Sequence, residues 1–201
     1  MEKKGFTVWF TGLPFSGKKK LAGMLAAELE SLGYKTEVLD GGKIRRKYEE
    51  DLGYSKEDVY KNIHRICFEC EMLTETDAVA IAVTISPFDE LREECRAKIG
   101  RYIEVYCKAP LKFLKDCDDK GLYEAAEQGN IPDVAGITAP FEEPKRPEVI
   151  FRTDKDSYEK GLAAIIKTLN MLDYIEKPAK KILSDEEEEL IRRHLKDMGY
   201  I

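Results

Sequence analysis

The chain has 201 residues, of which 43% are hydrophobic and 36% charged, and its formal net charge is −6. This length and composition are typical of one globular domain with a substantial core. The negative charge argues against nucleic acid or an anionic membrane as the main partner, and no apolar run reaches the roughly 18 residues that span a bilayer. Because the first residues show no hydrophobic leader, we expect a cytoplasmic protein.

Five short apolar runs predict strands, in chain order over residues 6–11, 36–40, 78–86, 101–109 and 148–153. Helical patterns lie between them. The first places four leucines on one face before Gly33, and others cover residues 55–74, 90–98 and 156–172. The alternation predicts an α/β fold: a three-layer sandwich with a five-stranded parallel sheet covered on both faces.

Two stretches depart from this alternation. Residues 117–147 are polar and rich in Gly and Pro, and a connection of this length inside a compact domain is usually a functional lid. After a domain predicted over residues 1–174, residues 175–201 form a linker and a C-terminal helix, which begins at Ser184 with Glu187 completing a capping box. The apolar face of this helix consists of Leu190, Ile191, Leu195 and Met198. It can pack on its own domain or dock a partner.

The five cysteines are odd in number and scattered, which argues against a disulfide framework. Cys67 and Cys70 form a C-x-x-C inside a predicted helix, but no second Cys or His pair follows at zinc spacing. We therefore expect packing thiols here, and no metal site.

The first strand is followed by Gly12-Leu13-Pro14-Phe15-Ser16-Gly17-Lys18-Lys19 and then a helix, which nearly matches the phosphate-binding loop G-x-x-x-x-G-K-[ST]. The glycines let backbone N–H groups face phosphate oxygens, and the helix N-terminus adds partial positive charge. Lys19 stands where a hydroxyl normally ligates Mg²⁺. Together with the β-α alternation, this loop predicts the three-layer sandwich of P-loop NTPases. A site for ATP or ADP is predicted, in which Mg²⁺ lacks its usual protein ligand. Its predicted residues are Gly12, Phe15, Ser16, Gly17, Lys18, Lys19 and Lys20.

Further motifs follow in order: D-G-G-K-I-R from Asp40, L-G-Y-S-K-E-D-V-Y-K-N-I from Leu52, I-S-P-F from Ile85, D-D-K-G-L-Y from Asp118, and G-I and P-F-E-E-P before residue 145. In this order and spacing they resemble the adenylylsulfate (APS) kinases over roughly residues 5–170. The resemblance implies transfer of the γ-phosphate of ATP to the 3′-hydroxyl of APS, which gives PAPS. It also implies Mg²⁺, a homodimer and a mobile lid over the nucleotides.

The resemblance carries over substrate contacts position by position. Arg45 and Asn62 match residues that contact APS, and Tyr54 matches an aromatic that stacks near its adenine. Ser86 and Pro87 follow the third strand, where α/β sheets place their ligands. In the lid, Lys120 and Leu122 belong to the K-G-L-Y segment, whose lysine contacts both nucleotides in the family.

The departures from the family pattern concern chemistry. The second aspartate of D-G-D is Gly42, which leaves Lys18 and Asp40 as the candidate catalytic residues. Arginines expected in the APS pocket, beside the adenine of ATP and after I-S-P are replaced by Val59, Cys117 and Asp89 respectively. The family's F-T-G-I reads V-A-G-I before residue 138.

Positioned acid–base groups are worth about 10²–10⁴-fold in rate, so these losses are expected to weaken or abolish turnover while the phosphate cradle still binds nucleotide. Three interpretations stay open. The protein is an APS kinase with unusual site residues, a non-catalytic domain that senses APS or PAPS and partners ATP sulfurylase, or a kinase for another hydroxyl acceptor.

Overall fold

The computed structural model describes residues 3–47, 52–53, 55–176 and 183–201. Five strands form one parallel sheet in the order β2-β3-β1-β4-β5. Their bounds are β1 Phe6–Thr11, β2 Thr36–Asp40, β3 Val79–Val83, β4 Tyr102–Lys108 and β5 Val149–Arg152. The predicted parallel sheet is therefore confirmed, although β3 ends three residues before its predicted end at Ser86, whose φ of 38° lies outside the β region.

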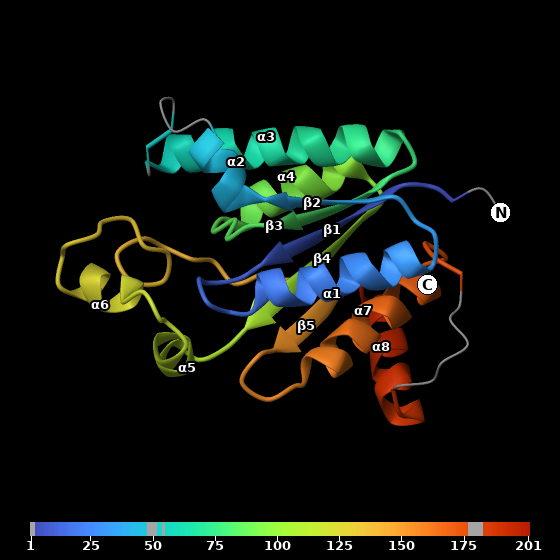
Figure 1. Ribbon diagram of the computed structural model, residues 1–201. Helices are drawn as coiled ribbons and strands as arrows, with labels where there is room; N and C mark the ends of the chain where they lie inside the picture. The colour runs from blue at the N-terminus through green and yellow to red at the C-terminus, as the bar shows by residue number, and fades with distance from the viewer. Residues whose placement is uncertain (1–2, 48–51, 54, 177–182) are drawn as a thin grey trace.

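Helices cover both faces of the sheet (Figure 1). On one face lie α2 (Gly41–Lys47), α3 (Lys56–Glu75) and α4 (Asp89–Ile99), and on the other lie α1 (Lys18–Ser31) and α7 (Tyr158–Met171). Each face has its own apolar cluster, one around Phe10, Leu25 and Ile165 and the other around Trp9, Ile66 and Leu91. Cys67 and Cys70 belong to the second cluster, where both side chains are buried.

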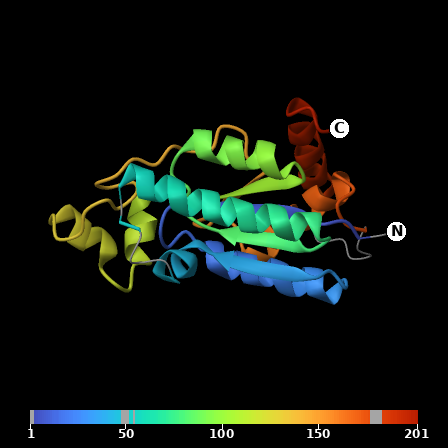
Figure 2. The ribbon, with the colours of Figure 1, turned by 90° about the horizontal axis from the view of Figure 1, so that it is seen from above.

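The lid region projects beyond the carboxyl ends of the strands, as the view from above also shows (Figure 2). The predicted lid, residues 117–147, contains one short helix, α6 (Leu122–Glu127), and a single bridge between Ala135 and Ala139. A second short helix, α5 (Leu111–Asp116), directly precedes it. A third apolar cluster, with Leu114, Tyr123 and Val134 at its centre, holds it together. The segment predicted as a lid therefore shares a small core with α5 and with Leu13 and Phe15 of the phosphate loop, and its role as a lid stays a prediction.

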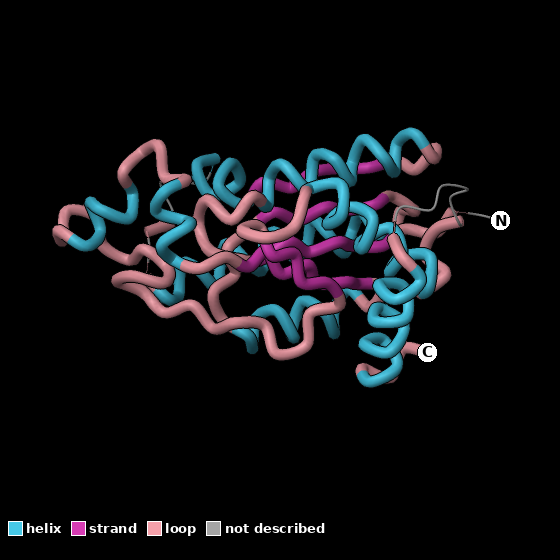
Figure 3. Tube along the Cα trace, turned by 90° about the horizontal axis from the view of Figure 1, so that it is seen from below, coloured by secondary structure: helices cyan, strands magenta, loops and turns pink. Residues whose placement is uncertain are grey.

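The last helix, α8 (Asp185–Asp197), packs against α7 at the end of the molecule away from α6 (Figure 3). The capping box of Ser184 and Glu187 is confirmed. Leu195 is fully buried, whereas Leu190 is 60% exposed, so only part of the predicted apolar face is covered. Among the described residues, no helix is long and apolar enough to cross a membrane.

Candidate functional site

The phosphate loop joins β1 to α1 through a series of left-handed backbone conformations. Gly12, Phe15 and Gly17 have φ values of 138°, 61° and 76°. A Cβ at Gly12 would lie 2.3 Å from the carbonyl oxygen of Cys107, and one at Gly17 would lie 2.4 Å from the hydroxyl of Tyr158. Gly12 is required because the backbone of β4 leaves no room for a side chain, and Gly17 is favoured because its φ is positive.

Lys18 lies at the centre of this loop. Its ammonium donates hydrogen bonds to the carbonyl oxygens of Gly12 (2.8 Å) and Leu13 (2.6 Å) and to the hydroxyl of Ser16 (3.1 Å). Burial lowers the pKa of Lys18 from 10.5 to about 8. The ammonium is therefore held among neutral oxygens of its own loop, and an anionic phosphate can take their place.

Asp40 ends β2 beside the loop, and its carboxylate is fully engaged. One oxygen accepts from the backbone N–H groups of Gly42 (2.9 Å) and Lys43 (3.2 Å). The other lies 2.8 Å from the ammonium of Lys19. Burial alone would raise the pKa of Asp40, but Lys19 and the two N–H groups outweigh it and lower the pKa. Asp40 is therefore ionised and paired with Lys19.

Residues from distant elements hold the loop in place. The hydroxyl of Thr153, just after β5, donates to the carbonyl of Ser16 at 2.8 Å. From the lid, the Tyr123 hydroxyl donates to the carbonyl of Pro14 at 2.8 Å, and its ring packs against Phe15. Sequence reasoning missed Thr153 as a supporting residue, since a lone threonine after a strand carries no signal. The K-G-L-Y segment predicts a lid around Tyr123, but not the contact of Tyr123 with the phosphate loop.

The residues predicted to bind APS are contributed by α2, α3 and the loop after β3. Arg45 lies half-buried on α2, which contacts α3, the helix that carries Asn62. Asn62 is 7% exposed, and among the described residues its side-chain oxygen has no hydrogen-bond partner. Buried amide oxygens are rarely left unpaired, so this atom is a candidate ligand contact. Tyr54 lies outside the described residues.

Ser86 and Pro87 are both buried. The Ser86 hydroxyl accepts from the Trp9 indole N–H (3.0 Å) and donates to Thr11 (3.1 Å). Its hydrogen bonds are thus used inside the fold, and the predicted contact of Ser86 with substrate stays a prediction.

In the lid, Lys120 is exposed, while Leu122 is half-buried against the lid cluster. Gly136 of the V-A-G-I segment has a φ of 85°, and a Cβ there would lie 2.7 Å from Leu13 of the phosphate loop. The lid therefore rests directly on the loop. The nucleotide contact predicted for Lys120 stays a prediction.

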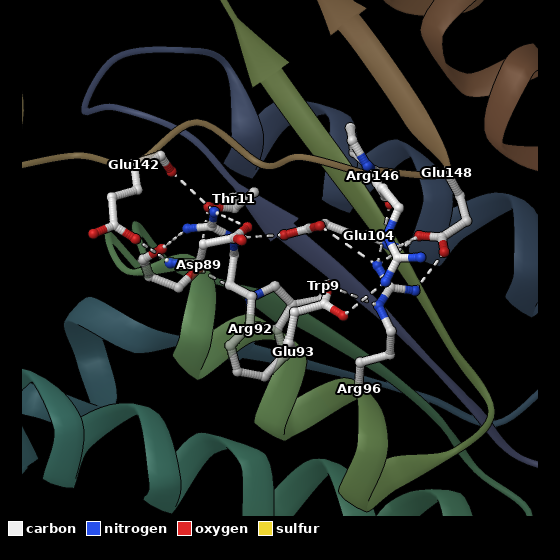
Figure 4. A network of polar contacts seen from close by, with 12 residues as sticks. Trp9, Thr11, Asp89, Arg92, Glu93, Arg96, Glu104, Glu142, Arg146 and Glu148 are labelled. Atoms are coloured by element: carbon white, nitrogen blue, oxygen red, sulfur yellow. Dashed lines mark hydrogen bonds and ion pairs between the residues drawn. The ribbon is translucent and has the colours of Figure 1, made fainter. Parts of the chain in front are cut away.

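A buried network behind the site was not predicted (Figure 4). Arg92 on α4 is 1% exposed and donates to the carbonyl of Ser86 (2.6 Å) and, in the lid, to that of Glu142 (2.9 Å). It also pairs with Asp89 at 3.0 Å and Glu104 at 2.9 Å. Burial raises the pKa of Glu104 to about 7, against the opposing effect of Arg92. Arg92 joins the loop after β3 to the base of the lid.

The position after Lys18 does not fit Mg²⁺. The resemblance implies this ion, but Lys19 supplies an ammonium in place of a hydroxyl. That ammonium already forms an ion pair with the carboxylate of Asp40. Within the described ranges, no cluster of three or more His, Cys, Asp or Glu side chains could hold a metal ion.

Comparison with known proteins gives the family. The adenylylsulphate kinase family matches residues 4–152. An adenylyl-sulfate kinase of Microcystis aeruginosa is 43% identical over 87% of this chain and 97% of its own. A probable bifunctional SAT/APS kinase of Sorangium cellulosum is 42% identical over 85% of this chain, but only 29% of its own. The Mycobacterium tuberculosis APS kinase, solved with AMPPNP and APS, has a TM-score of 0.76 at 33% identity, covering 81% of this chain and 96% of its own. The chain belongs to the adenylylsulphate kinase family.

Proposed function

We propose that the protein binds ATP in its phosphate loop and APS beside α2 and α3, and transfers the γ-phosphate to APS slowly, if at all, compared with its relatives. The observation that carries the binding part is the position of Lys18. Its buried ammonium is surrounded by three oxygens of the loop that a phosphate can replace, and Gly12 and Gly17 provide the positive φ values of the loop. A lysine with no ligand role would not be expected to lie buried away from any carboxylate.

The weak-transfer part rests on Lys19 and Gly42. Gly42 brings no second carboxylate next to Asp40, and Asp40 itself is neutralised by Lys19. The group that would take the proton from the acceptor hydroxyl is then missing or weakened. Loss of a positioned base costs about 10²–10⁴-fold in rate, and the missing metal hydroxyl adds to this loss.

Two other functions remain candidates. A non-catalytic domain that senses APS or PAPS is favoured by the same two substitutions, and the bifunctional SAT/APS kinase relative makes a sulfurylase partner a reasonable choice. A kinase for another hydroxyl acceptor is favoured by Val59 and Asp89, which change the predicted acceptor pocket; Asp89 is paired with Arg92 and with Lys145 at 3.0 Å. We place each of these activities in the cytoplasm, and expect a homodimer.

One assay distinguishes the three functions. The protein is incubated with ATP, APS and Mg²⁺, and both ADP and PAPS are measured, beside a double variant that restores the hydroxyl and the carboxylate (Lys19→Ser with Gly42→Asp). We expect slow PAPS formation that the double variant raises about 10²-fold or more. A wild-type rate equal to that of the double variant would refute weakened catalysis. Binding of ATP and APS without ADP release supports the sensor, and ADP release only with another hydroxyl compound supports the third function.

A further inference from the structure

The three consecutive lysines of the phosphate loop point to three different partners. Lys18 is buried among the oxygens of the loop. The ammonium of Lys20 lies 4.1 Å from the centre of the Tyr158 ring, toward α7. Lys19 extends to the other side, to Asp40 at the end of β2. Only Lys19 therefore joins the start of α1 to the carboxyl end of a second strand.

The Lys19–Asp40 pair occupies the place where a metal would be expected. A P-loop hydroxyl after the lysine normally holds Mg²⁺ against the phosphates. Here no hydroxyl is present at that position, and both oxygens of Asp40 are already used by Lys19 and by the N–H groups of Gly42 and Lys43. A divalent cation would have to displace the ammonium to reach the carboxylate.

The ammonium is held loosely enough to change partners. The Lys19 side chain is 70% exposed, whereas that of Asp40 is 12% exposed. Because the ammonium end of this ion pair lies in solvent, it can turn away from Asp40 without leaving a buried cation behind. When the ammonium moves from Asp40 to a phosphate oxygen, the Asp40 carboxylate keeps its hydrogen bonds from the N–H groups of Gly42 and Lys43, which offset part of the loss.

We propose that Lys19 is a built-in counter-ion that replaces the divalent metal when ATP binds, so that the affinity for ATP does not depend on Mg²⁺. This inference rests on the proposed function, in which ATP binds the phosphate loop. Lys18 contacts the outer phosphates from inside the loop, and Lys19 contacts them from the side of β2. One carboxylate and one ammonium balance each other in the free protein, and the phosphate takes over the ammonium in the complex.

The test is calorimetric titration of ATP, without APS, into the protein in excess Mg²⁺ and in excess EDTA. For the wild type, the two dissociation constants should agree within about threefold, because the counter-ion is part of the chain. For Lys19→Ser, affinity in EDTA should fall about tenfold or more, and Mg²⁺ should restore most of it, since the new hydroxyl can hold the metal.

Lys98→Ser is the matched control. Lys98 forms a similar ion pair with Glu71 at 2.9 Å on the outer helices α3 and α4, and this variant should bind as the wild type does. Thermal melting of both variants checks that each is folded. A wild type that loses tenfold or more in EDTA overturns the inference, as does a folded Lys19→Ser variant that keeps wild-type affinity in EDTA. A wild type that binds no ATP in either buffer instead removes the proposed function on which the inference rests.

Discussion

Two regions of this protein each surround a buried cation, and they do so in opposite ways. Arg92, in the network behind the site, has two carboxylates and two carbonyl oxygens as partners. Lys18, in the phosphate loop, has only carbonyl and hydroxyl oxygens. A cation with carboxylates is neutralised within the fold and serves structure. A cation without carboxylate partners keeps its charge available for an anionic ligand. Arg92 therefore supports the structure of the site, whereas Lys18 belongs to its binding surface.

The largest effect is expected in the network. Arg92→Leu should destabilise the protein by about 3–5 kcal/mol, because it leaves the Glu104 carboxylate buried without its main partner. Urea unfolding measures this. Arg146→Leu is the control, since Arg146 lies at the exposed edge of the same network (Figure 4), 68% exposed and 3.5 Å from Glu93, and it should change stability by less than about 1 kcal/mol. Equal losses of stability in both variants would show that buried Arg92 stabilises the fold no more than an exposed arginine does.

In the phosphate loop, a substitution at the buried cation should reduce ATP binding and not stability. Lys18→Met should weaken ATP binding by about 10²–10³-fold while the protein stays folded, because the methionine fills the space but provides no donor for phosphate. Calorimetry with ATP and a thermal melt measure the two quantities. Lys98→Met removes a lysine outside the site and should bind as the wild type does. If Lys18→Met unfolded the protein and Arg92→Leu did not, Lys18 would be the structural cation, which contradicts the roles assigned to the two residues.

The charge of Lys18 should also make binding depend on pH. With a pKa of about 8 in the free protein, Lys18 loses its proton above that pH, whereas bound phosphate favours the ammonium. ATP affinity should therefore fall by up to about tenfold between pH 8 and 9, with proton uptake on binding. Titrations in buffers with different ionisation heats detect that uptake. An affinity that is constant over this range would contradict a buried ammonium in the loop.

The lowered pKa of Lys18 should also make the stability of the protein depend on pH. The folded pKa of about 8 lies below the usual 10.5, so the unfolded chain binds more protons between these values. Lys18 should therefore make stability rise with pH in that window. Lys18→Met should lack this contribution, which provides the control for the pH titration.

The smallest effects compare two tyrosine hydroxyls, one in each region. Tyr123 donates to Pro14 of the phosphate loop, whereas Tyr200, after α8, donates to Glu148 at 2.5 Å. Glu148 belongs to the network because Arg96 donates to it at 3.2 Å and lies 3.5 Å from Glu104. Tyr123→Phe and Tyr200→Phe should each cost about 1 kcal/mol of stability. Only Tyr123→Phe should also weaken ATP binding, by about threefold, because it loosens the loop. Equal ATP affinities in the two variants would mean that the loop does not depend on its lid contact.

Much of this fold could be predicted because β1, β3 and β4 are short buried runs and the main helices are long. Residues 6–11 and 36–40 were predicted with the bounds that β1 and β2 have. The helices α2, α5 and α6 were not predicted, since each has only six or seven residues, too few for a helical period to stand out. Ser184 and Glu187 were found because a capping box is a local pattern.

The candidate site was only partly predictable, because a sequence pattern reveals groups of residues that are close along the chain. The phosphate loop is a contiguous motif, and its local geometry follows from its glycines. Arg92 reads as one more charged residue in a polar helix, and nothing next to it in the sequence indicates burial. Its partners Glu104 and Glu142 are 12 and 50 residues away, so only folding reveals the network.

By itself, the sequence determined the parallel α/β fold, the phosphate loop and the exchange of a hydroxyl for Lys19, because each depends on residues that are neighbours along the chain. The tertiary structure alone decided that the Lys19 ammonium meets Asp40, that Thr153 and Tyr123 support the loop, and that Arg92 is buried. Those contacts join elements far apart in the chain, and their energies depend on burial and distance, which a linear pattern does not contain.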